Sequence, residues 1–174
     1  MKKLALTDFA KYRYPSALEL SPDSRYLTFA LKDVDREGDG YRWNLWLYDL
    51  ERRESRQITQ GDDQRKAVWE DNTHILYKTT EPDEALRARG FEEEWTVYHR
   101  LNVCTGEDRE AFRLPMSVSG LWKMDEGRYV FTGETHLDRP NLLELTGEAL
   151  EKELVRRQQT RGYKVLTELP LCEN

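Results

Sequence analysis

The serines and histidines of this sequence are the residues whose side chains could form an acyl-transfer site, with serine as the nucleophile and histidine as the base. A nucleophilic serine of that kind sits in Gly-x-Ser-x-Gly, which holds it on a strained turn between a strand and a helix. The six serines, Ser16, Ser21, Ser24, Ser55, Ser117 and Ser119, all lie outside such a pattern. His74 and His99 are expected in strands and His136 in a polar loop, and a triad needs a serine partner for its histidine. The sequence therefore predicts no catalytic residue.

A second group of side chains could bind a metal ion. Asp33, Asp35 and Asp39 fall at alternating positions of an acidic segment that has a glycine at its sixth position, as in a calcium-binding loop. Two positions differ from that pattern, because Glu37 replaces the usual Asp or Asn and the twelfth residue is Asn44 rather than Glu. Flanking helices are not expected either. The segment is interpreted as a solvated loop between two strands, with these three aspartates as the candidates if calcium binds.

The elements around these residues are predicted to be β-hairpins. In "LELSPDSRYLTFALK", Leu18 to Lys32, two short apolar strands flank Ser21-Pro22-Asp23-Ser24. Pro22 has the φ that the second position of a tight turn needs, and Asp23 and Ser24 can hydrogen-bond to their own backbone. The chain is therefore expected to reverse at these four residues.

This turn-then-strand unit occurs three times, with strands that start at Arg25, Thr73 and Arg128. After each of the first two copies, a second pair of extended segments follows: 44–50 with 55–59, and 97–103 with 108–112. Units of four short antiparallel strands at a period of about 50 residues are typical of β-propeller blades. The predicted fold is all-β, an incomplete propeller of two four-stranded blades and part of a third. A β-sandwich is the alternative.

The segment Trp43 to Leu50 favours a blade, because both of its faces are apolar. Leu45 and Leu47 lie on one face, and Trp46 and Tyr48 lie on the other. A strand with one solvated face would alternate between apolar and polar residues. We therefore expect all four side chains to be buried between sheets.

The last third of the sequence changes character. Leucines and alanine recur at near-helical spacing between Leu142 and Leu154, and Thr146 can cap a helix over about 147–160. The extended segment "YKVLTELPLCEN" follows. The predicted organisation is one partial propeller domain over 1–174, with blade one at about 16–60, blade two at about 64–115 and a partial third blade at about 117–174 that contains the inserted helix.

Composition limits the partners. Of 174 residues, 34% are charged and the net charge is −6, whereas nucleic-acid-binding proteins usually carry a basic surface. No apolar run reaches the length of a signal peptide or a membrane span, so a cytoplasmic protein without nucleic-acid or membrane partners is expected. Cys104 and Cys172 are expected to be reduced, and no cofactor is predicted.

The order of these segments resembles a known family. The segments are, in order, "LTDFAKYRYPSALELSPDSRYLTFALKDVD", "NLWLYDLERRESRQIT", "WTVYHRLNV" and a helical insert followed by "GYKVLTELP". Together they resemble the N-terminal propeller of prolyl oligopeptidase family serine peptidases, in particular the acylaminoacyl-peptidase-like branch. In such enzymes a seven-bladed propeller precedes an α/β-hydrolase domain and screens the peptides that enter. The resemblance implies a non-catalytic fragment, truncated before that domain. Its partners would be a peptide substrate and the missing hydrolase domain.

Two further expectations follow from the resemblance. Dipeptidyl-peptidase relatives hold a substrate's amino group with paired glutamates, and Glu92 and Glu93, just before the strand that starts at Trp95, are the candidates here; a solvated run of charge is the alternative. Uncovered blade faces, such as that around Val118, Leu121 and Trp122, predict that the isolated chain self-associates, or that it is only marginally stable and aggregates. A free-standing, TolB-like propeller module that binds another protein is the alternative function.

Overall fold

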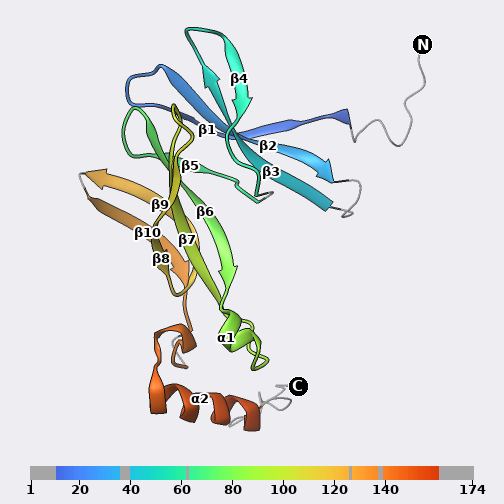
Figure 1. The fold of residues 1–174 in the computed structure, drawn as a ribbon, viewed down its shortest axis with the longest axis vertical. Coiled ribbons are helices and arrows are strands. Elements are labelled where there is room, and N and C mark those ends of the chain that lie inside the picture. The colour runs from blue at the N-terminus through green and yellow to red at the C-terminus, as the bar shows by residue number, and fades with distance from the viewer. Residues whose placement is uncertain (1–10, 36–39, 62, 126, 137–138, 161–174) are drawn as a thin grey trace, which may run out of the picture. The chain divides into compact units, whose positions relative to one another are not determined.

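The computed structural model describes residues 11–35, 40–61, 63–125, 127–136 and 139–160. The chain divides into two compact units, Met1–Glu134 and Thr135–Asn174. Figure 1 shows the strands of the first unit and the helix of the second.

The first sheet has four antiparallel strands that pair in sequence order. They are β1 (Tyr14–Leu20), β2 (Tyr26–Asp35), β3 (Gly40–Asp49) and β4 (Glu54–Gln57). The predicted turn between the first two is present, since the amide of Ser24 donates to the carbonyl of Ser21 at 2.8 Å. The Asp23 carboxylate accepts from the Ser21 hydroxyl at 2.6 Å and from the amide of Arg25 at 3.1 Å, so the side chain closes the turn as predicted.

The second sheet repeats this arrangement with β5 (Ala67–Trp69), β6 (His74–Pro82), β7 (Glu94–Asn102) and β8 (Asp108–Leu114). Its first turn again uses an aspartate, because Asp71 accepts from the amides of Thr73 and His74 at 2.7 and 2.8 Å. One short helix that the sequence analysis missed, α1 (Glu84–Arg87), connects the two middle strands. Asp83 caps it and also accepts from the indole of Trp95 at 3.1 Å.

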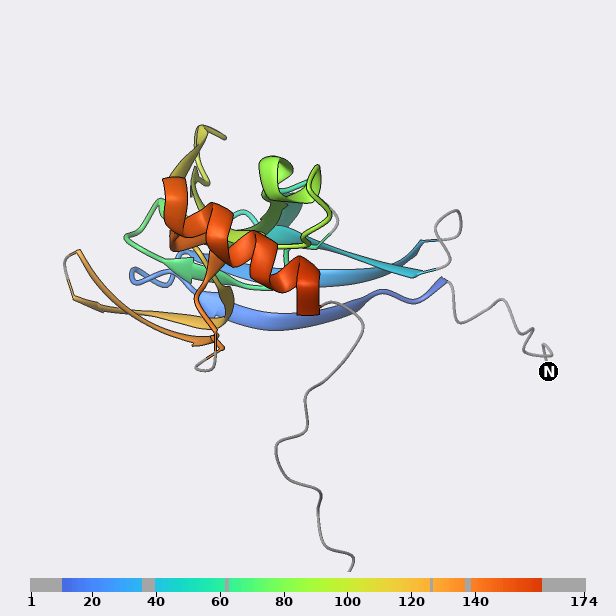
Figure 2. The same ribbon diagram turned by 90° about the horizontal axis from the view of Figure 1, so that it is seen from below.

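A hairpin of β9 (Ser117–Asp125) and β10 (Arg128–Glu134) forms the start of a third blade. The first strands of the three sheets are neighbours, with β1 beside β5 and β5 beside β9. Figure 1 shows the second sheet between the first sheet and this hairpin, and Figure 2 shows the same strands from below. Adjacent first strands with sheets that fan outward are the arrangement of a propeller, so the predicted incomplete propeller is confirmed.

The second sheet is buried on both faces. Ile75 and Tyr77 pack with Leu45 and Leu47 of the first sheet. Leu76, in contrast, packs on the opposite face with the hairpin and other strands, in a cluster with Tyr98, Val118 and Leu121. This middle sheet therefore has the two-sided core that the sequence pattern predicted for a blade.

The prediction for the first sheet was only half correct. Leu45 and Leu47 are buried, whereas Trp46 and Tyr48, on the other face, are half-buried. Phe29 stacks on Trp46 with ring centroids 6.5 Å apart, and this pair covers only part of the outer face. In the part of the chain that the structure describes, the sheet packed against this one is the second sheet, which covers the inner face alone.

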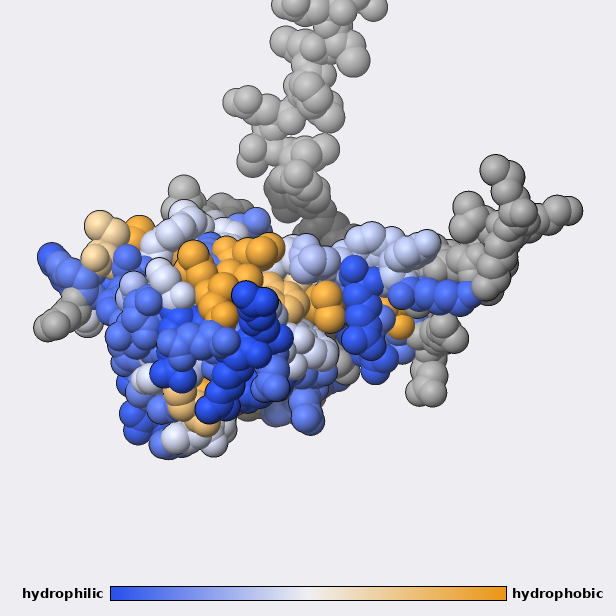
Figure 3. All heavy atoms as spheres, turned by 90° about the horizontal axis from the view of Figure 1, so that it is seen from above, coloured by the Kyte–Doolittle hydropathy of each residue, from blue (hydrophilic) through white to orange (hydrophobic). Residues whose placement is uncertain are grey.

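The third hairpin also corrects an expectation. Val118 and Leu121 are buried against the second sheet rather than lying on an uncovered face. The outward face carries Trp122, Met124 and Val130, which are 47%, 66% and 49% exposed. Figure 3 shows that hydrophobic side chains gather at the surface of the molecule between hydrophilic ones.

A buried carboxylate ties this hairpin to the second sheet. Glu70, in the first turn of the second sheet, accepts from the guanidinium of Arg100 and from the hydroxyl of Tyr129 on β10. The ammonium of Lys123 on β9 donates to the backbone carbonyl of Glu70. Burial by itself would raise the pKa of Glu70, but the hydrogen bonds from Arg100 and Tyr129 outweigh it and lower the pKa.

The second unit contains a 3-10 turn, η2 (Leu142–Glu144), and the predicted helix α2 (Gly147–Thr160). Glu153 pairs with Arg156 and Arg157 along the helix, and hydrogen bonds from these two arginines, Arg156 first, lower its pKa to about 2. Arg157 also donates to the carbonyl of Pro140 at 2.5 Å, which joins the helix to the segment before it. No helix among the described residues is long and apolar enough to cross a membrane.

Candidate functional site

The histidines are not arranged for nucleophilic catalysis. His74 Nδ1 lies 2.9 Å from the carboxylate of Asp71 and 3.1 Å from the hydroxyl of Thr73, while Nε2 faces the amide of Asn102 at 3.1 Å. A relay needs the carboxylate on one ring nitrogen and the hydroxyl on the other. Here both meet the same nitrogen, so His74 is part of a turn network rather than a general base.

His99 has a structural environment as well. Its ring stacks on Tyr77 with centroids 5.2 Å apart, and Nδ1 lies 3.6 Å from Asp108. The Tyr77 hydroxyl donates to the same carboxylate, and burial together with this hydrogen bond raises the pKa of Tyr77. Across the described ranges, no serine or cysteine side chain is hydrogen-bonded to a histidine.

The candidate calcium ligands do not all lie in a loop. Asp33 and Asp35 belong to β2, because their backbones pair with Arg42 and Gly40 of β3. Asp33 accepts from the amide of Val34 at 3.0 Å and faces Arg13 at 3.4 Å. Asp39 lies outside the described residues. Within the described ranges, no group of three or more acidic, histidine or cysteine residues could hold a metal ion.

The two candidate glutamates lie in the segment between α1 and β7. Glu92 is exposed and Glu93 is half-buried. The carbonyl of Glu93 accepts from the amide of Asp83 at 2.9 Å, which fixes the backbone next to the start of β7. Binding of an amino group by these side chains stays a prediction.

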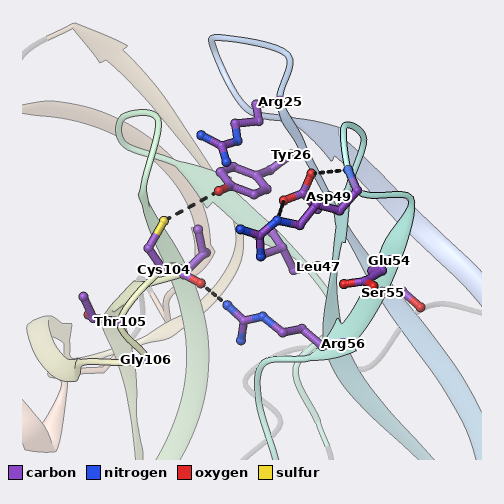
Figure 4. Close-up of a pocket in the computed structure, with 12 residues that line it drawn as sticks. Arg25, Tyr26, Leu47, Asp49, Glu54, Ser55, Arg56, Cys104, Thr105 and Gly106 are labelled. Atoms are coloured by element: carbon purple, nitrogen blue, oxygen red, sulfur yellow. Dashed lines mark hydrogen bonds and ion pairs between the residues drawn. The ribbon is translucent and has the colours of Figure 1, made fainter.

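A pocket of about 450 Å³ lies between the first and second sheets (Figure 4). It was not expected, because its residues come from turns that lie far apart in the sequence, near Arg25, Arg52 and Cys104. The lining residues are Arg25, Tyr26, Leu47, Asp49, Arg52, Glu54, Ser55, Arg56, Val103, Cys104, Thr105 and Gly106. Three arginines and two carboxylates make it a polar cleft of mixed charge.

Contacts across this pocket hold the two sheets together. Arg56 of β4 donates to the carbonyl of Val103, and the Tyr26 hydroxyl lies 3.9 Å from the thiol of Cys104, as Figure 4 shows. Burial, followed by the contact with Cys104, raises the pKa of Tyr26. On the side of the pocket formed by the first sheet, Asp49 accepts from the backbone amides of Arg52 and Glu51, both at 3.0 Å. These hydrogen bonds, that from Arg52 first, lower the pKa of Asp49.

The pocket holds one thiol and several groups that can form hydrogen bonds and ion pairs. Cys104 is exposed, and in the described part of the chain its thiol contacts the hydroxyl of Tyr26, which is not a base that could deprotonate it. The arginines and backbone groups could bind a polar ligand. Sequence reasoning could have located the pocket only by aligning the turns of the two repeats.

Comparison with known proteins identifies the fold. No protein-family model and no curated protein matches the sequence. Among solved structures, the β-propeller domain of the Trilobed protease from Pyrococcus furiosus, which has an open velcro topology, matches with a TM-score of 0.51 and 13% identity over 71% of this chain and 34% of that chain. The Pyrococcus horikoshii acylaminoacyl peptidase matches with a TM-score of 0.54 and 15% identity over 75% of this chain and 20% of that chain.

At these identities the likeness establishes a β-propeller fold. The chain spans about a third and a fifth of the two structures it matches.

Proposed function

We propose that this chain is a non-catalytic, N-terminal propeller part of a prolyl oligopeptidase-type serine peptidase, in which it helps to admit and select peptides for an α/β-hydrolase domain. The observation that carries the proposal is the blade repeat, in which three successive hairpins have adjacent first strands. The same fold occurs in the propeller domain of one protease and in a chain of an acylaminoacyl peptidase.

The chemistry of the described residues supports a binding role. His74 is held in a turn and His99 in a stacking contact, and the pocket between the first two sheets combines arginines with carboxylates and backbone groups. Such a surface can contact the polar backbone of a peptide without cleaving it. Hydrolysis would then depend on a second domain with its own nucleophile.

The test is to characterise the native polypeptide that contains this sequence. An antibody raised against the isolated chain would detect the native protein in extracts of the source cells. The precipitated protein would then be treated with a fluorophosphonate probe, which labels activated serines. We expect a polypeptide well above 20.7 kDa that the probe labels, with a Gly-x-Ser-x-Gly motif in its downstream sequence.

A native polypeptide of 20.7 kDa that the probe does not label would overturn the proposal. A control precipitation with antibody pre-absorbed on the isolated chain identifies labelled proteins that bind nonspecifically.

A free-standing protein-interaction module is the second candidate. The exposed outward face of the third hairpin, with Trp122, Met124 and Val130, favours it, because apolar patches on soluble proteins often mark binding surfaces. This candidate predicts the shorter native polypeptide, recovered with a partner that the variant Val130→Lys no longer binds.

A further inference from the structure

A second pocket, of about 260 Å³, lies between the second sheet and the third hairpin. Its lining residues are Asp63, Arg65, Lys66, Val68, Leu76, Lys78, Tyr98, Ser119, Gly120 and Leu121. All of them belong to the first unit, and they come from the segment before β5 and from strands β5, β6, β7 and β9. We call it the Lys78 pocket.

The floor of the Lys78 pocket is apolar. Leu76, Tyr98 and Leu121 are 1%, 4% and 3% exposed and belong to one packed cluster, with the half-buried Val68 beside them. Tyr98 is stacked on Phe112 with centroids 5.0 Å apart, and burial raises the pKa of its hydroxyl to about 12. The floor is therefore rigid, neutral at physiological pH, and suited to an aliphatic or aromatic group.

The rim of the pocket carries positive charge. Arg65, Lys66 and Lys78 are opposed by one lining carboxylate, Asp63, and that carboxylate is 2.7 Å from Arg65. Lys66 faces Glu19 at 3.7 Å and also lies 5.8 Å from the ring of Trp122. Two of the three cations thus already have an acidic partner.

Lys78 differs from the other two. Its side chain is half-buried, and its ammonium group donates to the backbone carbonyl of Val118 at 2.8 Å. Among the residues that the structure describes, no carboxylate forms an ion pair with it. A carbonyl oxygen accepts one of the three protons, so the charge is only partly compensated in a site that is partly shielded from water.

We propose that the Lys78 pocket binds an apolar side chain that is joined to a carboxylate, the chemistry shared by the C-terminal residue of a peptide and by an N-acylated amino acid. The carboxylate would pair with Lys78, where a charge-assisted hydrogen bond is strongest, and the side chain would cover Leu76 and Leu121. The volume lies below the range of drug-sized ligand sites, which matches a single residue. This site goes beyond the proposed function and does not depend on a hydrolase domain.

Titration of the isolated chain followed by amide NMR would test the proposal. The probes are N-acetyl-leucine, its amide N-acetyl-leucinamide, N-acetylglycine and the peptide Ala-Ala-Leu. We expect N-acetyl-leucine to bind at least tenfold more tightly than the amide, which lacks the charge, and than N-acetylglycine, which lacks the side chain. The relative affinity of Ala-Ala-Leu identifies which of the two carboxylate sources the pocket prefers.

Variants separate the role of Lys78 from general charge effects. Lys78→Met should weaken binding of N-acetyl-leucine at least tenfold, whereas Lys78→Arg should retain most of it. Lys152→Met is the matched control, because Lys152 lies on α2 in the second unit, pairs with Glu148 and is 76% exposed. Ser119→Phe should also weaken binding, because it fills the pocket from an exposed strand position and leaves the charge of Lys78 intact.

Each variant is used only after its thermal melt shows a cooperative transition. Three results would each overturn the proposal. The first is equal binding of the acid and the amide, and the second is unchanged binding of N-acetyl-leucine by both Lys78→Met and Ser119→Phe. The third is no binding of N-acetyl-leucine at concentrations up to about 50-fold above its expected Kd, which for so small a ligand is on the order of millimolar. None of these results bears on whether the native polypeptide contains a hydrolase domain.

Discussion

At the scale of single residues, the molecule uses its polar side chains to join segments. Asp23 and Asp71 each close the first turn of a blade with backbone hydrogen bonds. Glu70 links the second sheet to the third hairpin through Arg100 and Tyr129. Asp23 and Asp71 accept from exposed turn amides, whereas Glu70 compensates side-chain donors that are partly shielded from water.

The first prediction concerns Glu70, whose side chain is 9% exposed. Glu70→Gln should lower the free energy of unfolding by about 2 kcal/mol at pH 7, since hydrogen bonds to a charged group contribute more than neutral ones. The pKa of Glu70 is lowered in the folded protein, so its contribution is present above the unfolded value of about 4.3 and is lost as pH falls through the folded value. Urea melts at pH 7 and pH 3 would measure this.

The difference between the Glu70→Gln variant and the unchanged protein should therefore shrink at pH 3. The exposed Glu92→Gln serves as the control and should change stability little at either pH. A constant difference across this range would contradict the assignment of the stabilisation to the ionised carboxylate.

The second prediction is that the isolated chain hydrolyses no peptide and no acyl-amino-acid ester. The serines lie outside a nucleophile turn, and the hydrogen bonds of His74 leave neither ring nitrogen facing a serine. Acyl transfer requires both an activated nucleophile and an oxyanion site. Turnover that survives rigorous purification and is blocked by a serine-directed inhibitor would refute it.

At the scale of elements, the two complete sheets have the same strand order and different burial. Strand β6 is buried on both faces, with Ile75 and Tyr77 on one and Leu76 on the other. Strand β3 is buried only where Leu45 and Leu47 face the second sheet. The position of a sheet among its neighbours, rather than its own sequence pattern, decides how much of it is buried.

The third prediction follows from this asymmetry. Leu45 is fully buried, so Leu45→Ala should cost about 2–5 kcal/mol, as large-to-small core substitutions do. Trp46→Ala removes a larger side chain from a half-buried position, and its neighbours can relax toward solvent. We expect it to cost less than Leu45→Ala in denaturant melts, and a larger loss for Trp46→Ala would mean that the outer face is covered in solution.

At the scale of the whole molecule, the first unit exposes apolar residues at both of its outer faces. Leu18 and Leu20 on the first sheet are 59% and 55% exposed, and Trp122 and Val130 on the hairpin are 47% and 49% exposed. Patches of this kind on a soluble protein usually contact another surface.

The fourth prediction is that the isolated chain self-associates through these faces. Sedimentation equilibrium across a wide concentration range should show an average mass that rises with concentration, and Val130→Lys should reduce the association because it places a charge in the apolar patch. Lys152→Met, in the second unit, is the control. A strictly monomeric, cooperatively melting chain would argue against association.

The sequence by itself determined the local elements of this protein. Pro22 with Asp23 specified the first turn, and the three apolar strands after turns specified the blade repeat, because tight turns and strand pairing between neighbours in sequence depend on nearby residues. The helix at 147–160 was likewise predictable from the spacing of its leucines. The missing nucleophile motif also follows from sequence alone.

Tertiary structure decided burial and both pockets. Trp46 and Leu45 are adjacent and similarly apolar, yet only one of them faces a neighbouring sheet. Lys78 and Ser119 are 41 positions apart and line one pocket because the hairpin packs on the second sheet. Arg25 and Cys104 line the other pocket because the first and second sheets pack together. Such contacts depend on the angle between neighbouring sheets. That angle is set by the packing of many side chains together, and it leaves no periodic pattern in the amino-acid sequence.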